Sequence, residues 1–166
     1  FGELFAAGKP DSLLKWDYPL RDETRRCFVG LLQTNLPQPT LDRLYATIRD
    51  GTCWDQPKRP QSGELLPRKT DWMVAERCLC RYRYGGVEVD PSEFPSWMED
   101  VMELCMPLCG LRGRTRWPNC CNLNLYEDGG MTVGWHADDE EIFQGKSSDC
   151  SIISLSLGQT RTFEIK

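Results

Sequence analysis

Apolar residues recur at intervals of three and four in two segments of the chain, which is the spacing of an amphipathic helix. The first segment follows Pro37-Gln38-Pro39, where Thr40 can cap a helix that Gly51 ends. The second begins at Pro95-Ser96 and ends near Pro107. Both patterns are typical of helices that face a core. The apolar positions are Leu41, Leu44, Tyr45 and Ile48 in the first segment and Trp97, Val101, Leu104 and Cys105 in the second.

From Asn119 onward the pattern changes to alternation of apolar and polar residues, the period of half-buried strands. Turns are expected at Gly129-Gly130 and at Gly158. Because helices come first and strands last, the sequence predicts an α+β fold in which helices brace one side of a β-sandwich or jelly roll. The expected strands are 121–125, 132–136, 151–157 and 160–166.

The rest of the chain is less regular. Residues 1–26 carry no recognisable motif and are interpreted as a linker or a leading helix. Residues 51–66 are expected to form a loop, and residues 71–84 a loop that passes into a strand closed by Gly85-Gly86. At 166 residues the chain fits one domain, here placed at 27–166. It starts without methionine and ends in a strand-like pattern, so both ends are expected to be cut.

Charge is distributed unevenly along the chain. The net charge of −5 argues against general adhesion to nucleic acid. From Lys58 to Arg83, however, there are seven basic and three acidic residues. The segments 88–103 and 127–141 each carry six acidic residues and no lysine or arginine. Solvated surface is the simplest interpretation of such blocks.

Cysteine usage indicates a reduced protein. Nine cysteines are an odd number for a disulfide framework, and no apolar run is long enough for a signal peptide or a membrane span. The spacings do not form the paired Cys-x-x-Cys elements of a structural zinc site. We expect nine free thiols, mainly buried, in a monomeric intracellular protein of the nucleus or cytosol.

The single histidine, His136, lies two residues before Asp138. Residues two apart on a strand point to the same side, so the imidazole and the carboxylate are expected side by side, facing the interior of the strands. Non-haem Fe(II) oxygenases bind iron through two histidines and one carboxylate, and this pair would supply two of the three ligands. The alternative is a buried structural histidine that is hydrogen-bonded to Asp138 or Asp139.

Four ordered motifs resemble the AlkB family of Fe(II)/2-oxoglutarate dioxygenases, and most of all its members that demethylate alkylated nucleic acids. The resemblance implies an incomplete double-stranded β-helix (jelly roll) with supporting helices, a nucleotide-recognition region at 58–86, and the first core strands at 119–166. The motifs are Pro67-Arg68-Lys69-Thr70-Asp71-Trp72, Asn124-Leu125-Tyr126, His136-Ala137-Asp138-Asp139-Glu140, and the run from Ser154 to Phe163.

The resemblance also implies roles for individual residues. His136 and Asp138 would bind Fe(II), and Asn124 and Tyr126 would donate hydrogen bonds to the cosubstrate 2-oxoglutarate. Glu140 would lie on the substrate side and accept from the exocyclic amine of a flipped base. For Asn124 and Tyr126, the alternative is an ordinary strand position.

Three further residues are candidates for binding single-stranded or locally opened nucleic acid. Tyr82 and Tyr84 would stack on the flipped base, although alternating aromatic residues in a strand more often pack against a core. Arg68, together with the basic region 58–83, would meet the phosphate backbone. Asp71 stands where similar proteins have a small residue, and a carboxylate there would repel phosphate.

The resemblance predicts an enzyme that oxidatively demethylates bases in DNA or RNA. The chain contains neither a second histidine nor the later strands that would supply it and an arginine for 2-oxoglutarate. We therefore expect this chain to be a partial, catalytically silent copy. Two alternatives stay open: a non-catalytic nucleic-acid-binding module, and a dioxygenase that acts on protein or lipid.

Overall fold

The computed structural model describes residues 15–145, 147–148 and 150–165, which divide into two compact units. One unit comprises the described residues up to Leu44 together with those from Leu157 onward, and the other is Tyr45–Ser156. The boundary falls inside helix α1 (Gln38–Gly51). Every predicted site residue lies in the second unit.

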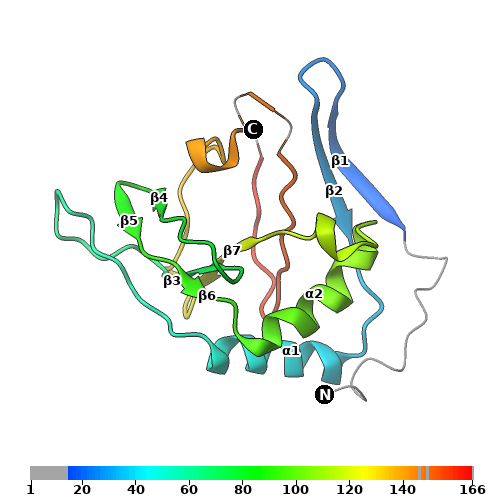
Figure 1. The fold of residues 1–166 in the computed structure, drawn as a ribbon, viewed down its shortest axis with the longest axis horizontal. Coiled ribbons are helices and arrows are strands. Elements are labelled where there is room, and N and C mark those ends of the chain that lie inside the picture. The colour runs from blue at the N-terminus through cyan, green and yellow to red at the C-terminus, as the bar shows by residue number, and fades with distance from the viewer. Residues whose placement is uncertain (1–14, 146, 149, 166) are drawn as a thin grey trace. The chain divides into compact units, whose positions relative to one another are not determined.

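The first unit contains a β-hairpin. Strands β1 (Trp16–Asp22) and β2 (Cys27–Leu32) pair antiparallel (Figure 1). The Asp22 carboxylate accepts hydrogen bonds from the Thr24 and Arg25 backbone N–H groups, both at 3.0 Å, and closes the turn. The prediction of a linker or leading helix is therefore wrong for 16–22, because the apolar run that follows supplies a pairing partner. Residues 1–14 lie outside the described residues.

Both predicted helices are confirmed. Helix α1 begins two residues before Thr40, so the expectation that Thr40 caps it is wrong, and α2 (Ser96–Leu108) follows Pro95 as expected. Within α2 the buried side chains are Met98, Met102 and Met106, not the expected apolar stripe. Methionines spaced by four residues share one helix face, and their flexible side chains fill irregular space well.

The second unit is built on a three-stranded sheet of order β6-β3-β7 (Figure 1). β3 (Lys69–Val74) pairs antiparallel with β7 (Cys120–Leu125) and parallel with β6 (Ser92–Glu93). Residues 69–74 therefore form a strand where the sequence analysis expected a loop from residue 71. The polar residues Lys69 and Asp71 hid the pattern, because they alternate with Thr70, Trp72 and Val74, which are all buried.

Alternation along β3 divides the core into two clusters. Trp72 and Val74 belong to one cluster and Met73 to the other. We call them the aromatic cluster and the methionine cluster. The aromatic cluster consists of Leu66, Trp72, Val74, Tyr82, Tyr84 and Val87, and the methionine cluster of Met73, Met98, Met102, Met106 and Leu123.

The aromatic cluster receives part of its side chains from a second hairpin, β4 (Tyr82–Tyr84) and β5 (Val87–Val89). The turn is Gly85-Gly86, with φ of 55° and 81°. These angles favour glycine, so the predicted closing turn is confirmed.

Beyond β7 the described residues form no further strand, and the one regular element is the 3₁₀ helix η2 (Glu141–Phe143) (Figure 1). The expected strands at 132–136, 151–157 and 160–165 are thus wrong for this structure, and Lys166 lies outside the described residues. A strand needs a hydrogen-bonded neighbour along its length, whereas the bond from Thr132 N–H to the Pro67 carbonyl, at 2.7 Å, belongs to no strand pairing. Two helices and three small sheets nonetheless make the described residues an α+β arrangement.

No helix in these ranges has the length and apolarity that crossing a membrane requires. All nine cysteines are free thiols, as predicted, although none is fully buried, so the expectation of mainly buried thiols is wrong.

Candidate functional site

His136 and Asp138 lie side by side in the segment that follows β7. The His136 Nε2 atom is 3.5 Å from Asp138 Oδ1, and His136 Nδ1 is 2.7 Å from the Gly134 carbonyl oxygen. A carbonyl can only accept, so Nδ1 carries a proton, and in the neutral imidazole Nε2 then holds the lone pair beside the carboxylate. This tautomer is the one that a metal ligand needs.

The pair lies at the surface, with side chains 52% and 46% exposed. The expectation that it faces the interior of the strands is therefore wrong, since the strands that would enclose it are absent from the described residues. The alternative of a buried structural histidine does not hold either.

Asn124 lies in β7 opposite Thr70 of β3, and Tyr126 follows two residues later. The Asn124 Oδ1 atom accepts a hydrogen bond from Arg68 Nε at 2.8 Å. This bond occupies the amide oxygen, so the NH₂ group is the part that remains to donate. Asn124 is exposed and Tyr126 is half-buried.

Arg68 is buried, with 9% of its surface exposed. Its guanidinium lies 5.3 Å from the centre of the Tyr84 ring and is bonded to Asn124. The expectation that Arg68 meets a phosphate backbone is therefore not met in this structure, because the side chain is buried and its Nε–H is bonded to Asn124. It positions the Asn124 amide instead.

Glu140 is joined to the β4–β5 hairpin. The Tyr82 hydroxyl donates to Glu140 Oε1 at 3.0 Å, and the other carboxylate oxygen is buried without a hydrogen-bond partner among the described residues. Burial, followed by the charge of Glu140, raises the pKa of the Tyr82 hydroxyl far above its usual range. Tyr82 therefore stays a donor, and it ties the segment after Asp138 to the aromatic cluster.

Tyr82 and Tyr84 are both buried. The Tyr82 ring centre lies 4.6 Å from Trp72 and 4.9 Å from Tyr84. Tyr84 also shares a 2.7 Å hydrogen bond with the Thr70 hydroxyl. The rings already stack on one another, which supports the packing alternative. An incoming base would have to separate them before it could stack.

Part of the basic block forms ion pairs or hydrogen bonds within the protein. Lys69 bonds Glu127 at 2.9 Å, and Arg81 bonds Asp90 at 2.6 Å. Arg59 donates to the Gly85 carbonyl at 3.2 Å. In contrast, Lys58 and Arg83 form no ion pair with any residue in the described ranges. Together with Arg59, whose carbonyl partner is uncharged, these side chains carry charge that can attract phosphate.

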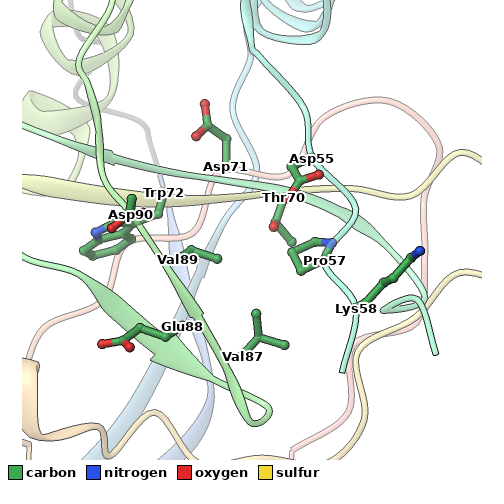
Figure 2. Close-up of a pocket in the computed structure, with 10 residues that line it drawn as sticks. All are labelled: Asp55, Pro57, Lys58, Thr70, Asp71, Trp72, Val87, Glu88, Val89 and Asp90. Carbon is green, nitrogen blue, oxygen red and sulfur yellow. The ribbon is translucent and has the colours of Figure 1, made fainter. Parts of the chain in front are cut away.

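A cavity of about 390 Å³ is lined by residues of the 55–58 segment, of β3 and of the 87–90 stretch that contains β5 (Figure 2). Four carboxylates and one ammonium group line it, so it disfavours a phosphate. None of the eight predicted site residues belongs to its lining. The lining residues are Asp55, Pro57, Lys58, Thr70, Asp71, Trp72, Val87, Glu88, Val89 and Asp90.

Comparison with known proteins decides the family. Residues 28–166 match the model of the 2OG-Fe(II) oxygenase superfamily. The chain belongs to this superfamily. It is 31% identical over 126 residues to the alpha-ketoglutarate-dependent dioxygenase alkB homolog 3 of Rattus norvegicus, and this match covers 72% of the chain and 39% of the relative. The Homo sapiens protein of that name is 31% identical with 40% of its length covered, and the Mus musculus protein 29% with 40%.

These relatives confirm the AlkB-like resemblance, and the superfamily confirms Fe(II) and 2-oxoglutarate as cofactor and cosubstrate. The chain spans about two fifths of the length of the relatives it matches.

The residues of this 2OG-Fe(II) oxygenase fit iron in part. Two metal bonds of about 2.1 Å at right angles place their donor atoms roughly 3 Å apart, close to the 3.5 Å between His136 Nε2 and Asp138 Oδ1. Within the described ranges, however, no three histidine, cysteine or acidic side chains are arranged to hold a metal. The structure supplies two ligands of the expected kind and no third.

Two residues of the oxygenase site received no role in the sequence analysis. Thr70 holds the Tyr84 hydroxyl, and Trp72 carries the ring on which Tyr82 stacks. Both belong to the Pro67–Trp72 motif, which was interpreted only as a marker of the recognition region. Their spacing of two on a strand was the available clue, because it places both on the face of Tyr82 and Tyr84.

Proposed function

We propose that this chain is part of an AlkB-like dioxygenase that demethylates alkylated bases in DNA or RNA. The observation that carries the proposal is the bond between Tyr82 and Glu140. It joins the segment of His136 and Asp138 to the β4–β5 hairpin of the recognition region. The metal and the substrate would therefore bind next to each other. The complete catalytic domain would be a jelly roll whose first strand is β7.

His136 Nε2 and Asp138 Oδ1 would hold Fe(II). The Asn124 NH₂ group and the Tyr126 hydroxyl would donate to 2-oxoglutarate, and Arg68 would hold the Asn124 amide in the orientation that permits this. Bound iron with 2-oxoglutarate and oxygen supplies the hydroxylation of an N-linked methyl group, which then leaves as formaldehyde while succinate and carbon dioxide are released.

Glu140 would recognise the base. Its buried oxygen without a partner can accept from the exocyclic amine of a flipped base, while Tyr82 holds the other oxygen. Lys58 and Arg83 would attract the phosphates of a single strand, because neither is neutralised by an ion pair among the described residues.

The test is formaldehyde release from methylated single-stranded DNA and RNA oligonucleotides. It compares this chain with a version extended by the downstream sequence that its gene encodes. We expect turnover by the extended chain, abolished by His136→Ala, and none by this chain, because two ligands hold iron weakly. Iron-dependent release from this chain would contradict its proposed silence, and an inactive extended chain would contradict the demethylase.

Oligonucleotide binding tests the substrate side separately. The double variant Lys58→Ala/Arg83→Ala should bind single strands more weakly and with a smaller dependence on salt, by about one released counterion per lost contact. Arg77→Ala is the matched control, since the exposed Arg77 pairs with neighbouring Glu76 at 3.5 Å. An unchanged salt slope in the double variant would show that Lys58 and Arg83 do not contact phosphate.

The lack of a third metal ligand among the described residues favours a second candidate, a non-catalytic nucleic-acid-binding module. The two functions differ in their dependence on metal. A module binds methylated oligonucleotides equally well with and without a chelator, and its extended form releases no formaldehyde.

A further inference from the structure

Phe143 packs the segment that follows Asp138 onto the aromatic cluster. It is the last residue of η2, and its ring centre lies 5.6 Å from the Tyr82 ring and 6.3 Å from the Trp72 ring. The ring planes are inclined by 59° and 66°, close to the edge-to-face arrangement that aromatic pairs prefer. Phe143 thus forms an apolar contact between η2 and the buried rings of β3 and β4.

Tyr82 contacts both ends of the turn that contains Phe143. Its ring packs against Phe143 at the end of the turn, and its hydroxyl donates to Glu140 Oε1 at the start. The Phe143 N–H donates to the Glu140 carbonyl oxygen at 3.0 Å, so the backbone also holds the two residues together. The position of the Glu140 carboxylate therefore depends on the position of the Phe143 ring.

The chain then returns to Asp138. A methyl group at Gly145 would lie 3.4 Å from the Asp138 carbonyl oxygen, which is ordinary van der Waals contact. Residues 138–145 therefore form a short closed loop that carries Glu140 and includes Phe143. Because the loop is short and its ends touch, a displacement of the Phe143 ring would also move Glu140.

The Glu140 carboxylate in this loop has one oxygen left to bind a ligand. Oε1 accepts from Tyr82, whereas Oε2 is buried without a hydrogen-bond partner among the described residues. A buried acceptor that lacks a donor costs free energy, so a ligand that brings an N–H group is favoured over one that brings a carbonyl oxygen. This discrimination requires that the carboxylate stays where Tyr82 holds it.

We propose that Phe143 is a specificity-determining positioning residue, which keeps Glu140 against Tyr82 so that the buried oxygen accepts from an exocyclic amino group of the substrate base. Phe143 acts through Glu140 and needs no contact of its own with the substrate. The substrate class rests on the proposed function, whereas the placement of Glu140 by Phe143 does not.

A double-mutant cycle tests the placement without metal or nucleic acid. Tyr82→Phe keeps the ring that Phe143 contacts and removes only the donor to Glu140. If Phe143 holds Glu140 in place, Tyr82→Phe should lower the unfolding free energy less than about half as much in the Phe143→Ala background as in the unaltered chain. Additive effects of Phe143→Ala and Tyr82→Phe in denaturant unfolding would overturn the proposal.

Two variants control this cycle. Phe143→Leu keeps an apolar side chain on the aromatic cluster and should restore most of the coupling with Tyr82→Phe. Ile142→Ala removes the neighbouring side chain of η2, which is 38% exposed, and should leave the effect of Tyr82→Phe unchanged. A coupling that Ile142→Ala reduces as strongly as Phe143→Ala would mean that η2 as a whole, and not the Phe143 ring, places Glu140, and would likewise overturn the proposal.

Substrate discrimination tests the consequence for the reaction. In the extended chain, turnover of 3-methylcytosine is compared with turnover of 3-methylthymine, which has a carbonyl oxygen in place of the amino group. Phe143→Ala should lower the ratio of the two kcat/KM values at least about tenfold, as expected for loss of one hydrogen bond to a charged group, while Phe143→Leu and Ile142→Ala should largely preserve it.

A purely structural role of Phe143 would lower both kcat/KM values by the same factor. An unchanged ratio in Phe143→Ala would therefore overturn its role in specificity. Absence of turnover on both bases by the unaltered extended chain would overturn the proposed function together with the substrate class, while the double-mutant cycle decides separately whether Phe143 places Glu140.

Discussion

The candidate site is made of two regions that differ in how firmly they are held. Residues of β3, β4 and β7 are fixed by strand pairing and by the buried rings of the aromatic cluster. Residues 132–140 have no strand pairing, and His136 and Asp138 are about half exposed. The recognition half of the site is thus a packed structure, while the metal half is a surface segment attached through contacts outside the sheets.

Two of these attachment points are defined by hydrogen bonds. The Thr132 N–H donates to the Pro67 carbonyl, and the Tyr82 hydroxyl donates to Glu140. Both partners precede β7 in sequence and belong to the recognition region. The difference between the halves teaches that a motif can be chemically specific and still depend on distant residues for its position.

Disrupting the packed recognition half of the site should have the largest effect on stability. Trp72 is 2% exposed and contacts Tyr82, so Trp72→Ala should lower the free energy of unfolding by about 3–5 kcal/mol. His136→Ala, at the surface, should change it by less than about 0.5 kcal/mol. Denaturant unfolding of both variants measures the two values. Equal losses would mean that the halves are not held differently.

Loss of the hydrogen bond between Tyr82 and Glu140, which links the two halves, should lower the stability by less. Tyr82→Phe keeps the ring but removes the donor to Glu140, leaving both carboxylate oxygens without a partner, and should cost about 1–3 kcal/mol. Denaturant unfolding at neutral pH is the measurement. Tyr84→Phe, which removes a hydroxyl bonded to Thr70, is the matched control for loss of a buried hydroxyl.

A double-mutant cycle separates the link from simple loss of a hydroxyl. If Tyr82 and Glu140 interact directly, Tyr82→Phe should cost less when Glu140→Gln is already present. Additive effects in the cycle would rule out the direct link, whereas Tyr84→Phe should be additive with Glu140→Gln.

Replacing Asp71 should change the free energy of unfolding least, and the change should depend on pH. Burial raises its pKa, although the Ser92 hydroxyl donates to it at 3.0 Å. The folded protein therefore binds the proton more tightly than the unfolded chain, and stability falls as pH rises from the unfolded to the folded pKa. Asp71→Asn keeps an acceptor for Ser92 and should be more stable by about 0.5 kcal/mol at pH 7.

The control for Asp71→Asn is low pH. Below the pKa of Asp71 in the unfolded chain both proteins are uncharged at this position, so the difference in unfolding free energy should vanish. A stabilisation that persists in acid would point to packing and not to ionisation.

The sequence predicts those elements that depend on neighbouring residues, and it fails for those that depend on pairing with distant residues. Both helices and the Gly85-Gly86 hairpin turn were predictable because apolar period, flanking prolines and glycine conformation are local properties. β3 was not, because Lys69 and Asp71 break the apolar pattern and pairing with β7, some fifty residues later, makes it a strand.

The candidate site shows the same limit. The adjacency of His136 and Asp138 followed from their spacing of two, even though the expected strand is absent. The environment of Arg68 could not be predicted, because its burial depends on Asn124 and Tyr84, which lie far away in the sequence. A residue type alone does not tell whether a guanidinium meets phosphate or an internal amide.

The central claim is that His136 and Asp138 together bind the metal. His136 is the only histidine, so its two imidazole C–H protons give one assignable set of NMR signals. Titration with Mn²⁺, a paramagnetic substitute for Fe²⁺, should broaden these signals in a saturable way, and Asp138→Asn should weaken the effect at least about tenfold whereas Asp139→Asn should not. Broadening that is absent, or equally strong in Asp138→Asn, would contradict the account.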